Sequence, residues 1–155
     1  YNGLVPTVGG FEGGVHTWAP VNITYGHNNR SAQFRLPQNR YCIENRAADL
    51  TMNIYLALGM TISAAVDGIK NKIEPGKPSD FDLYALKEDD MKKLGIRRLP
   101  RNLLQAVELL QNNKIAEKVL GKVMLNSYVN YKYDEWERYH QAVTDWEIKE
   151  YLRLY

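Results

Sequence analysis

Between residues 31 and 37, apolar and polar positions alternate strictly. In the run SAQFRLP every second residue is apolar, from Ala32 through Phe34 to Leu36, which is the two-residue period of a strand with one buried face. Arg35 is therefore expected on the face opposite Phe34. The neighbouring runs VNITYG and RYCIEN also have strand character, so this part of the chain predicts several short strands.

From Asn53 onward the apolar period changes to three and four residues, which predicts helices. The first helix is expected to end near Lys70, with an apolar stripe made of Tyr55, Leu58, Ile62, Ala65 and Ile69. Further helices are expected near 100–112, in a short stretch that ends at Gly121, and over about 122–141. The run TDWE, from Thr144 to Glu147, has the form of a capping box that opens a last helix. Strands first and helices after indicate the α+β class.

Composition narrows the possible partners. The chain has 155 residues and a formal net charge of +2, too small to indicate a nucleic acid or an acidic membrane as partner. A single cysteine, Cys42, excludes an internal disulfide and fits a reducing compartment, so a cytoplasmic protein is expected. No apolar run is long enough to span a bilayer. The first residue is Tyr1 rather than Met, which suggests a fragment or a processed chain.

Neither the histidines nor the single cysteine of the sequence indicates a metal site or a catalytic nucleophile. The three histidines, His16, His27 and His140, lack metal-ligand spacing, so each is expected to be a surface or core residue. Cys42 lies in the strand-like run RYCIEN and is expected to be a small buried hydrophobe rather than a nucleophile.

Three arginines and a glutamate form a denser constellation: Arg30, Arg35, Glu44 and Arg46 fall within 17 residues. On an extended chain Glu44 and Arg46 share one side. One interpretation is an ion-paired sheet face, which the pattern alone favours. The other is an anion site, in which arginines grip phosphate and a substrate carboxylate while Glu44 holds a divalent cation. The pattern leaves both open.

Several longer runs resemble one family. In chain order, NRSAQFRLP, IENR, NIYLALG, DGIKNKIEPGKPSDFDLYAL and VTDWE are similar to the C-terminal part of the glutamine synthetase family. The DGIKNKI run with its following prolines and aspartates is the most specific. The resemblance covers essentially all of this chain. It covers only about the last third of a typical family member. It implies short antiparallel strands followed by a helical region, divided here into a flap and strands at 1–47 and a mainly helical part at 48–155.

The resemblance also implies an activity and a set of roles. Family members use ATP to phosphorylate the side-chain carboxylate of glutamate, and ammonia then displaces phosphate to give glutamine, a reaction of nitrogen metabolism. By position in the motifs, Arg30 would stabilise the transferring phosphoryl group and Arg35 would contact nucleotide phosphates. Glu44 would ligate Mg²⁺ or Mn²⁺, and Arg46 would pair with a carboxylate of glutamate. Asn29 and Ser31 belong to the same motif but receive no role.

Departures from the family pattern leave the acceptor open. Gly3 and Cys42 stand where the family usually has arginines, and Trp18, in TWAP, stands where the flap usually carries a catalytic glutamate. The TWAP form resembles the type III-like branch, whose members include ligases of glutamate with methylamine or other amines. Glu12, in GGFEGG, would supply a flap carboxylate, or belongs to an ordinary exposed loop. Tyr84 occupies a position that is adenylylated in some bacterial members, but a plain loop tyrosine is the simpler interpretation.

The expected function is thus the C-terminal part of an ATP-dependent glutamate–ammonia ligase. The alternatives are a glutamate–alkylamine or polyamine ligase, or a non-catalytic structural or regulatory homologue. Because the family's other metal ligands lie upstream of the matched region, the isolated chain is expected to be inactive. A homo-oligomer is expected, with contacts through the aromatic-rich stretch from Tyr128 to Tyr155.

Overall fold

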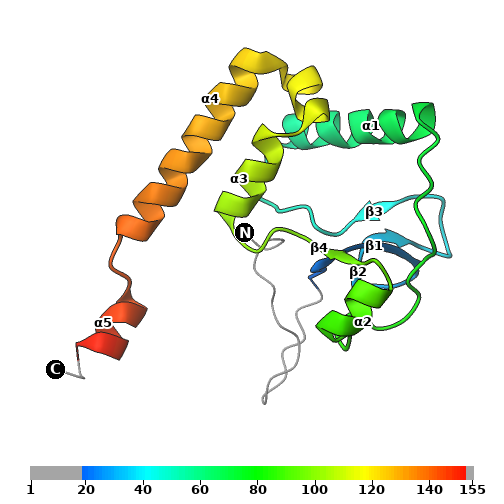
Figure 1. The fold of residues 1–155 in the computed structure, drawn as a ribbon, viewed down its shortest axis with the longest axis horizontal. Coiled ribbons are helices and arrows are strands. Elements are labelled where there is room, and N and C mark those ends of the chain that lie inside the picture. Colours follow the sequence, from blue (N-terminus) through cyan, green and yellow to red (C-terminus); the bar gives the residue numbers. More distant parts are fainter. Residues whose placement is uncertain (1–18, 153–155) are drawn as a thin grey trace. The chain divides into compact units, whose positions relative to one another are not determined.

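The computed structural model describes residues 19–152 and confirms the α+β class, with a small sheet accompanied by helices (Figure 1). The described elements are β1 (Asn22–His27), β2 (Ala32–Leu36), β3 (Glu44–Asn45), α1 (Ile54–Lys70), α2 (Glu88–Lys93), β4 (Arg97–Arg98), α3 (Leu103–Gln111), α4 (Lys114–Gln141) and α5 (Asp145–Tyr151). They form two compact units, one up to Asn102 and one from Leu103. None of the helices within 19–152 combines the length and apolar character needed to cross a bilayer.

The four described strands make one mixed sheet in the order β3-β2-β1-β4. β3 and β4 pair antiparallel with their neighbours, but β1 and β2 pair parallel, so the expectation of antiparallel strands was wrong for this central pair. Parallel pairing ordinarily takes a crossover of a dozen residues or more, and here only residues 28–31 separate the strands. Asn28 has a φ of 51° and donates its N–H to the carbonyl of Leu36 at 2.8 Å. The 28–31 connection thus begins with a left-handed residue, which no apolar pattern reveals.

The core of the first unit lies where the sheet meets the segments that follow α1. Ala32 is fully buried at the start of β2, as its place in the alternating pattern predicts. Leu83, from the connector after α1, and Met91, from α2, are buried with it. The connector therefore packs as part of the unit although its sequence, rich in proline and aspartate, indicated only turns.

The third strand is shorter than expected, and this changes the environment of Cys42. β3 contains only Glu44 and Asn45, and Cys42 is exposed. The backbone N–H of Cys42 donates to the carbonyl of Arg40 at 3.1 Å, a turn contact that turns the chain away from the ladder. The prediction of a buried strand cysteine was wrong, because this local turn overrides the strand propensity of the flanking residues.

Helix α1 has the predicted bounds, and Asn53 caps it by accepting from the N–H groups of Tyr55 and Leu56. None of its side chains is fully buried. The large side chains exposed on it are Ile54, Tyr55, Leu58, Ile62, Val66 and Ile69. The helix is thus confirmed, but the larger side chains of its expected apolar stripe are exposed rather than buried.

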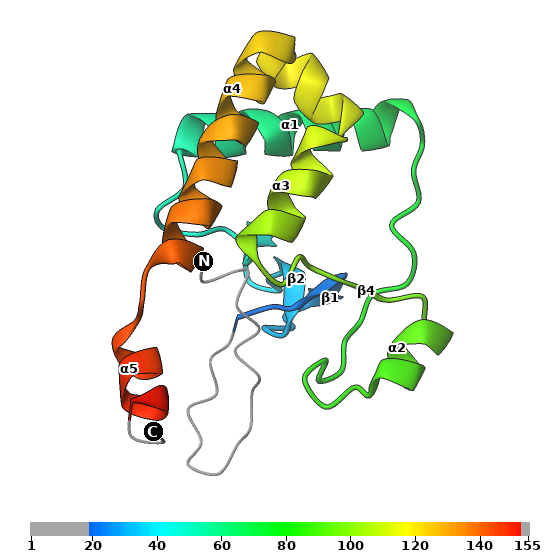
Figure 2. The same cartoon turned by 60° about the vertical axis from the view of Figure 1, so that its left-hand side comes forward.

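Helices α3 and α4 of the second unit lie side by side (Figures 1 and 2). Val107 of α3 and Leu125 of α4 are buried, and Tyr133 donates its hydroxyl to the side chain of Gln111 at 3.1 Å. Gly121 interrupts α4 with φ 71° and ψ 156°, which confirms the predicted short helix up to Gly121 and the long one after it.

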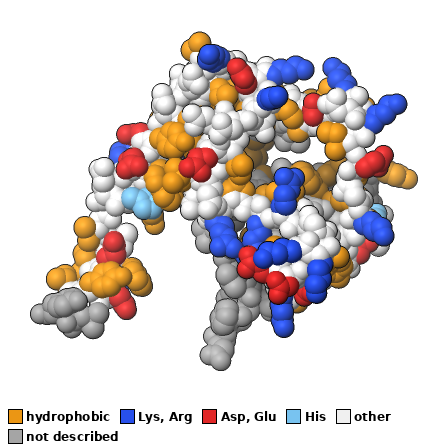
Figure 3. Space-filling view, in the orientation of Figure 1, with side chains coloured by type: hydrophobic (Ala, Val, Ile, Leu, Met, Phe, Trp, Pro, Cys, Tyr) orange, Lys and Arg blue, Asp and Glu red, His pale blue; other side chains and the backbone are white. Residues whose placement is uncertain are grey.

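The last helix, α5, begins at the predicted capping box. Glu147 donates its backbone N–H to the hydroxyl of Thr144, and its carboxylate accepts the backbone N–H of Thr144. The large side chains of α5, among them Trp146 and Tyr151, are exposed. Hydrophobic side chains of this helix form an orange group at the lower left of Figure 3. Two elements were missed: α2, whose sequence indicated only a charged segment, and the two-residue strand β4.

Candidate anion site

The centre of the candidate site is an ion pair across two strands. Arg35 of β2 lies directly opposite Glu44 of β3, and its Nη1 donates to Glu44 Oε2 at 2.9 Å. Arg40, in the turn between the strands, donates to the other carboxylate oxygen, and the second Nη of Arg35 donates to the side chain of Asn28. Two guanidinium groups therefore hold one carboxylate at the edge of the sheet.

Electrostatics follow from this arrangement. The hydrogen bond from Arg35, helped by the one from Arg40, lowers the pKa of Glu44 below its ordinary value. The side chains of Arg35 and Glu44 are only 16% and 25% exposed, so solvent screens this pair less than a fully exposed one. Glu44 is accordingly a carboxylate at neutral pH, with both oxygens already accepting hydrogen bonds.

Arg46 follows β3 and lies beside β2, because its backbone N–H donates to the carbonyl of Gln33 at 2.8 Å. Among residues 19–152, its buried Nη1 has no hydrogen-bond partner, and neither has the buried Nε of Arg35. A buried N–H of a charged fork is costly when it lacks an acceptor. Each of these two donors suits an added carboxylate or phosphate oxygen.

Arg30 occupies a different place. It is exposed in the 28–31 connection, between Asn29 and Ser31, and it lies outside the ion-paired group. Of the predicted site residues, the structure thus joins Arg35 to Glu44, sets Arg46 beside β2 through its backbone, and leaves Arg30 at the start of that strand.

Four of the residues singled out in the sequence, Gly3, Glu12, His16 and Trp18, lie outside the described residues. Within 19–152, no group of three or more His, Cys, Asp or Glu side chains is placed to hold a metal ion. Glu44 is chemically suited to Mg²⁺ as an oxygen ligand, but the described residues do not complete a metal site around it.

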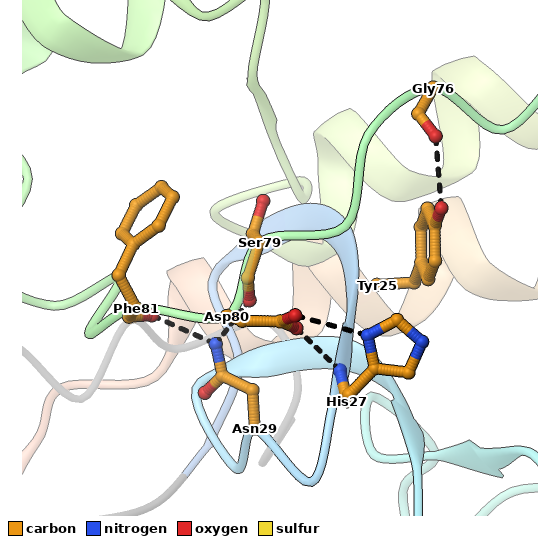
Figure 4. A network of polar contacts seen from close by, with 7 residues as sticks. All are labelled: Tyr25, His27, Asn29, Gly76, Ser79, Asp80 and Phe81. Atoms are coloured by element: carbon orange, nitrogen blue, oxygen red, sulfur yellow. Dashed lines mark hydrogen bonds and ion pairs between the residues drawn. The ribbon is translucent and has the colours of Figure 1, made fainter.

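Residues 76–84, called here the 76–84 loop, lie along β1 (Figure 4). Tyr25 donates its hydroxyl to the carbonyl of Gly76 at 2.9 Å, and its own carbonyl accepts the N–H of Ser79 at 2.8 Å. Asp80 accepts the backbone N–H of His27 at 2.6 Å, and its second oxygen lies 3.0 Å from Nδ1 of the same residue. These contacts with His27, the side chain first and the backbone next, lower the pKa of Asp80.

The same loop ends at Tyr84, whose hydroxyl donates to the carbonyl of Ala19 at 2.8 Å. Burial raises the pKa of Tyr84 above its ordinary value. The phenol is therefore protonated at neutral pH and engaged with the backbone, as a structural tyrosine would be.

Comparison with known proteins identifies the family of this chain. Residues 5–151 match the family described as the glutamine synthetase catalytic domain. The chain belongs to the glutamine synthetase family. The resemblance in the NRSAQFRLP, IENR and DGIKNKI runs is thereby confirmed, whereas the roles of the individual residues stay predictions.

The chain is similar to proteins with two different activity names, glutamine synthetase and glutamate–methylamine ligase. The glutamine synthetase of Methanocaldococcus jannaschii is 39% identical, over 98% of this chain and 32% of the relative. The glutamate–methylamine ligase of Methyloversatilis universalis is 37% identical, over 90% of this chain and 31% of the relative. A solved GmaS/ADP complex superposes with a TM-score of 0.78 at 29% identity, over 98% of this chain and 36% of that chain. The chain therefore spans about a third of the length of these proteins.

Two contributors to the site were missed from the sequence. Arg40 was not singled out, although a basic residue four positions before Glu44 is a usable signal when a turn joins the two. Asn28 was overlooked because its contact with Arg35 depends on the left-handed backbone of the 28–31 connection.

Proposed function

We propose that the protein containing this chain is an ATP-dependent ligase that joins glutamate to ammonia or a small amine. One observation carries the proposal: the in-register pair of Arg35 and Glu44, with a buried unpartnered donor of Arg46 beside β2, in a chain of the glutamine synthetase family. Unpartnered guanidinium donors suit a substrate with phosphate and carboxylate oxygens.

The reaction has two steps. The side-chain carboxylate of glutamate attacks the γ-phosphorus of ATP, the bond to the bridging oxygen breaks, and ADP leaves. The amine nitrogen then attacks the carbonyl carbon of the acyl phosphate, phosphate leaves with the electron pair of the broken C–O bond, and a proton is lost from nitrogen. Negative charge gathers on the transferring phosphoryl oxygens in the first step, which is where guanidinium groups lower the barrier.

Each arginine has a role in this scheme. Arg30, exposed at the start of β2, offsets charge on the transferring phosphoryl group. Arg35 contacts nucleotide phosphates, and Arg46 pairs with a carboxylate of glutamate. The exposure of Arg30 and the unpartnered donors of Arg35 and Arg46 support this division.

A divalent cation, Mg²⁺ or Mn²⁺, belongs to the proposal with a limited contribution from this chain. Glu44 supplies one carboxylate ligand, and the remaining ligands come from outside the described residues. Such a cation supplies charge neutralisation at phosphate oxygens. Residues 1–155 then act as the C-terminal portion of the catalytic domain, with the flap and strands at 1–47 and the mainly helical part at 48–155, and are inactive alone.

Methylamine is the second candidate acceptor. It is favoured by the similarity to the ligase of M. universalis and to the solved GmaS structures. The full-length protein is proposed to form a homo-oligomer, which its hydrodynamic mass tests.

The deciding experiment measures release of ADP and formation of the amide by the full-length protein with ATP and glutamate, supplied with ammonia or with methylamine. Amide formed with ammonia supports a glutamine synthetase, and amide formed only with methylamine supports the alternative. Failure to bind ATP in calorimetry, together with no amide from either acceptor, supports a non-catalytic homologue and refutes the proposal.

A further inference from the structure

The residues on both sides of Arg30 are tied to the 76–84 loop by hydrogen bonds of their side chains. The amide nitrogen of Asn29 donates to the carbonyls of Ser79 and Phe81, at 2.6 and 2.8 Å (Figure 4). The amide oxygen of Asn29 accepts the N–H and the hydroxyl of Ser31, at 2.9 and 2.7 Å. Asn29 thereby uses both of its donors and both acceptor positions.

Ser31 continues this connection into the core. Its hydroxyl oxygen accepts the N–H of Leu83 at 3.1 Å. Ser31 and Leu83 are each 2% exposed, so water does not replace these bonds and each is costly to leave unmade. An unbroken path of hydrogen bonds runs from Leu83 through Ser31 to Asn29 and on to Ser79 and Phe81.

The close approach of the loop to β1 depends on a missing side chain. A Cβ added to Gly26 would lie 2.4 Å from the carbonyl oxygen of Ser79 and 2.9 Å from Cβ of Asn29. Gly26 therefore admits the carbonyl that Asn29 binds. Within four residues, the sequence provides both the glycine that leaves this space and the asparagine side chain that binds the carbonyl filling it.

We infer that Asn29 and Ser31 are positioning residues that hold the backbone of Arg30 against the 76–84 loop, so that its guanidinium group is directed at the transferring phosphoryl group. This rests on the proposed function. Neither side chain touches substrate in this scheme; both act through Arg30. The reason is geometric: the 28–31 connection is short, and the exposed Arg30 has its two chain neighbours fixed while its own side chain extends from the turn.

The sharpest variant is Asn29→Asp in the full-length protein. Aspartate keeps the shape and the oxygen that faces Ser31, but it replaces the two donated hydrogen bonds with a carboxylate oxygen against two carbonyls. The expected result is a fall in kcat of about 10- to 100-fold with KM for ATP changed by less than about threefold, because misplacing a catalytic group costs turnover more than binding.

Tyr25→Phe is the matched control. It also removes a side-chain hydrogen bond between β1 and the 76–84 loop, the one to Gly76. Tyr25 lies five residues before Arg30, whereas Asn29 is its direct neighbour. Its kcat is expected to stay within about twofold of the unmodified protein. Loss of turnover equal to that of Asn29→Asp would mean that any loosening of the loop has the same effect, and would overturn the inference.

A double-mutant cycle separates positioning from general stability. If Asn29 acts through Arg30, Arg30→Ala/Asn29→Asp turns over no more slowly than Arg30→Ala alone, because the group being positioned is already absent. An additional loss equal to that of Asn29→Asp in the unmodified background overturns the inference. Should Asn29→Asp fail to fold, Ser31→Ala replaces it in the double-mutant cycle. No additional loss of turnover in the Arg30→Ala background supports the inference, and a full additional loss overturns it.

The failure of the proposed function is recognisable separately. A full-length protein with no ligase activity on either acceptor removes both proposals. An active protein whose turnover is unaffected by Asn29→Asp removes only the positioning of Arg30.

Discussion

Arg35 and Glu44 are direct cross-strand neighbours, with Nη1 and Oε2 2.9 Å apart. The pair exists because β2 and β3 meet in this register: a slip of one residue would send Arg35 to the other face of the sheet. Arg40 adds a second guanidinium to the same carboxylate. The arrangement is an ion pair in this chain, and its buried unpartnered Nε leaves Arg35 a further donor for an anion.

Replacing Glu44 by Gln keeps the shape and removes the charge. In the full-length protein, the Mg²⁺ concentration that gives half-maximal ligase activity is expected to rise by at least about tenfold, since a neutral amide is a poorer ligand and the neighbouring arginines lose their counterion. A titration of initial rate against Mg²⁺ measures this. Glu108→Gln, on the exposed side of α3, is the control and should leave the midpoint unchanged. An equal midpoint for Glu44→Gln and the unmodified protein would falsify the ligand role.

Removing the side chain of Arg30 should affect the chemical step. Arg30→Ala is expected to lower kcat by about 100- to 1000-fold while KM for ATP changes little, because its charge is needed where charge develops. Arg30→Lys should recover only part of the loss, since an ammonium group lacks the planar fork. Steady-state kinetics of the full-length protein test both, with the exposed Arg97→Ala as control. A rise in KM for ATP at unchanged kcat would assign Arg30 to ground-state nucleotide binding instead.

Local signals in the sequence predicted much of the fold. The helix from Ile54 to Lys70, the break at Gly121 and the capping box at Thr144 each depend on residues within a few positions of one another, and the structure confirms all three. Contacts between distant segments were not predictable in this way. Neither the parallel pairing of β1 with β2 nor the φ of 51° at Asn28 has a signature in the apolar pattern.

In the candidate site too, local features were predictable from the sequence and contacts between distant segments were not. The alternation in SAQFRLP correctly indicated a strand carrying Arg35, and the pattern offered an ion-paired face as one of two interpretations. It did not reveal that Asn29 reaches Ser79 and Phe81, some fifty positions away, because an asparagine in a turn has many local uses. The pattern singled out Arg30 and Glu44, but the roles expected of them came from the family resemblance, because the pattern left the ion-paired face and the anion site both open.

Exposure of Cys42 predicts its chemistry. Because the thiol lies outside β3 and is exposed, a disulfide reagent should label the native protein at this residue about as fast as it does in urea. Mass spectrometry of the labelled peptide locates the modification. Cys42→Ser should change the free energy of unfolding by less than about 0.5 kcal/mol. Protection of the thiol until the protein unfolds would contradict the exposed position.

Two glycines offer a matched comparison. Gly26→Ala should lower the free energy of unfolding by about 1–3 kcal/mol, since its Cβ would lie 2.4 Å from the backbone oxygen of Ser79, which must move. Gly68→Ala, in α1 with nothing within 4 Å of an added Cβ, should raise it by about 0.5–1 kcal/mol. Urea unfolding of the full-length protein measures both. Destabilisation by Gly68→Ala equal to that by Gly26→Ala would show that the contact with Ser79 is not the cause.

Asp80 predicts how the attachment of the 76–84 loop depends on pH. Its contacts with His27 lower its pKa in the folded protein, so folding favours the carboxylate. The stabilisation is therefore complete above the ordinary value of about 3.9 and is lost as the pH falls through the lower folded value. Asp80→Asn should reduce the urea midpoint at pH 7, and its difference from the unmodified protein should shrink as the pH is brought below 4. His27→Ala should remove much of the effect of Asp80→Asn at pH 7, because the two side chains act as a pair. A difference that grows on acidification would reverse the sign and show that the folded protein favours the protonated acid.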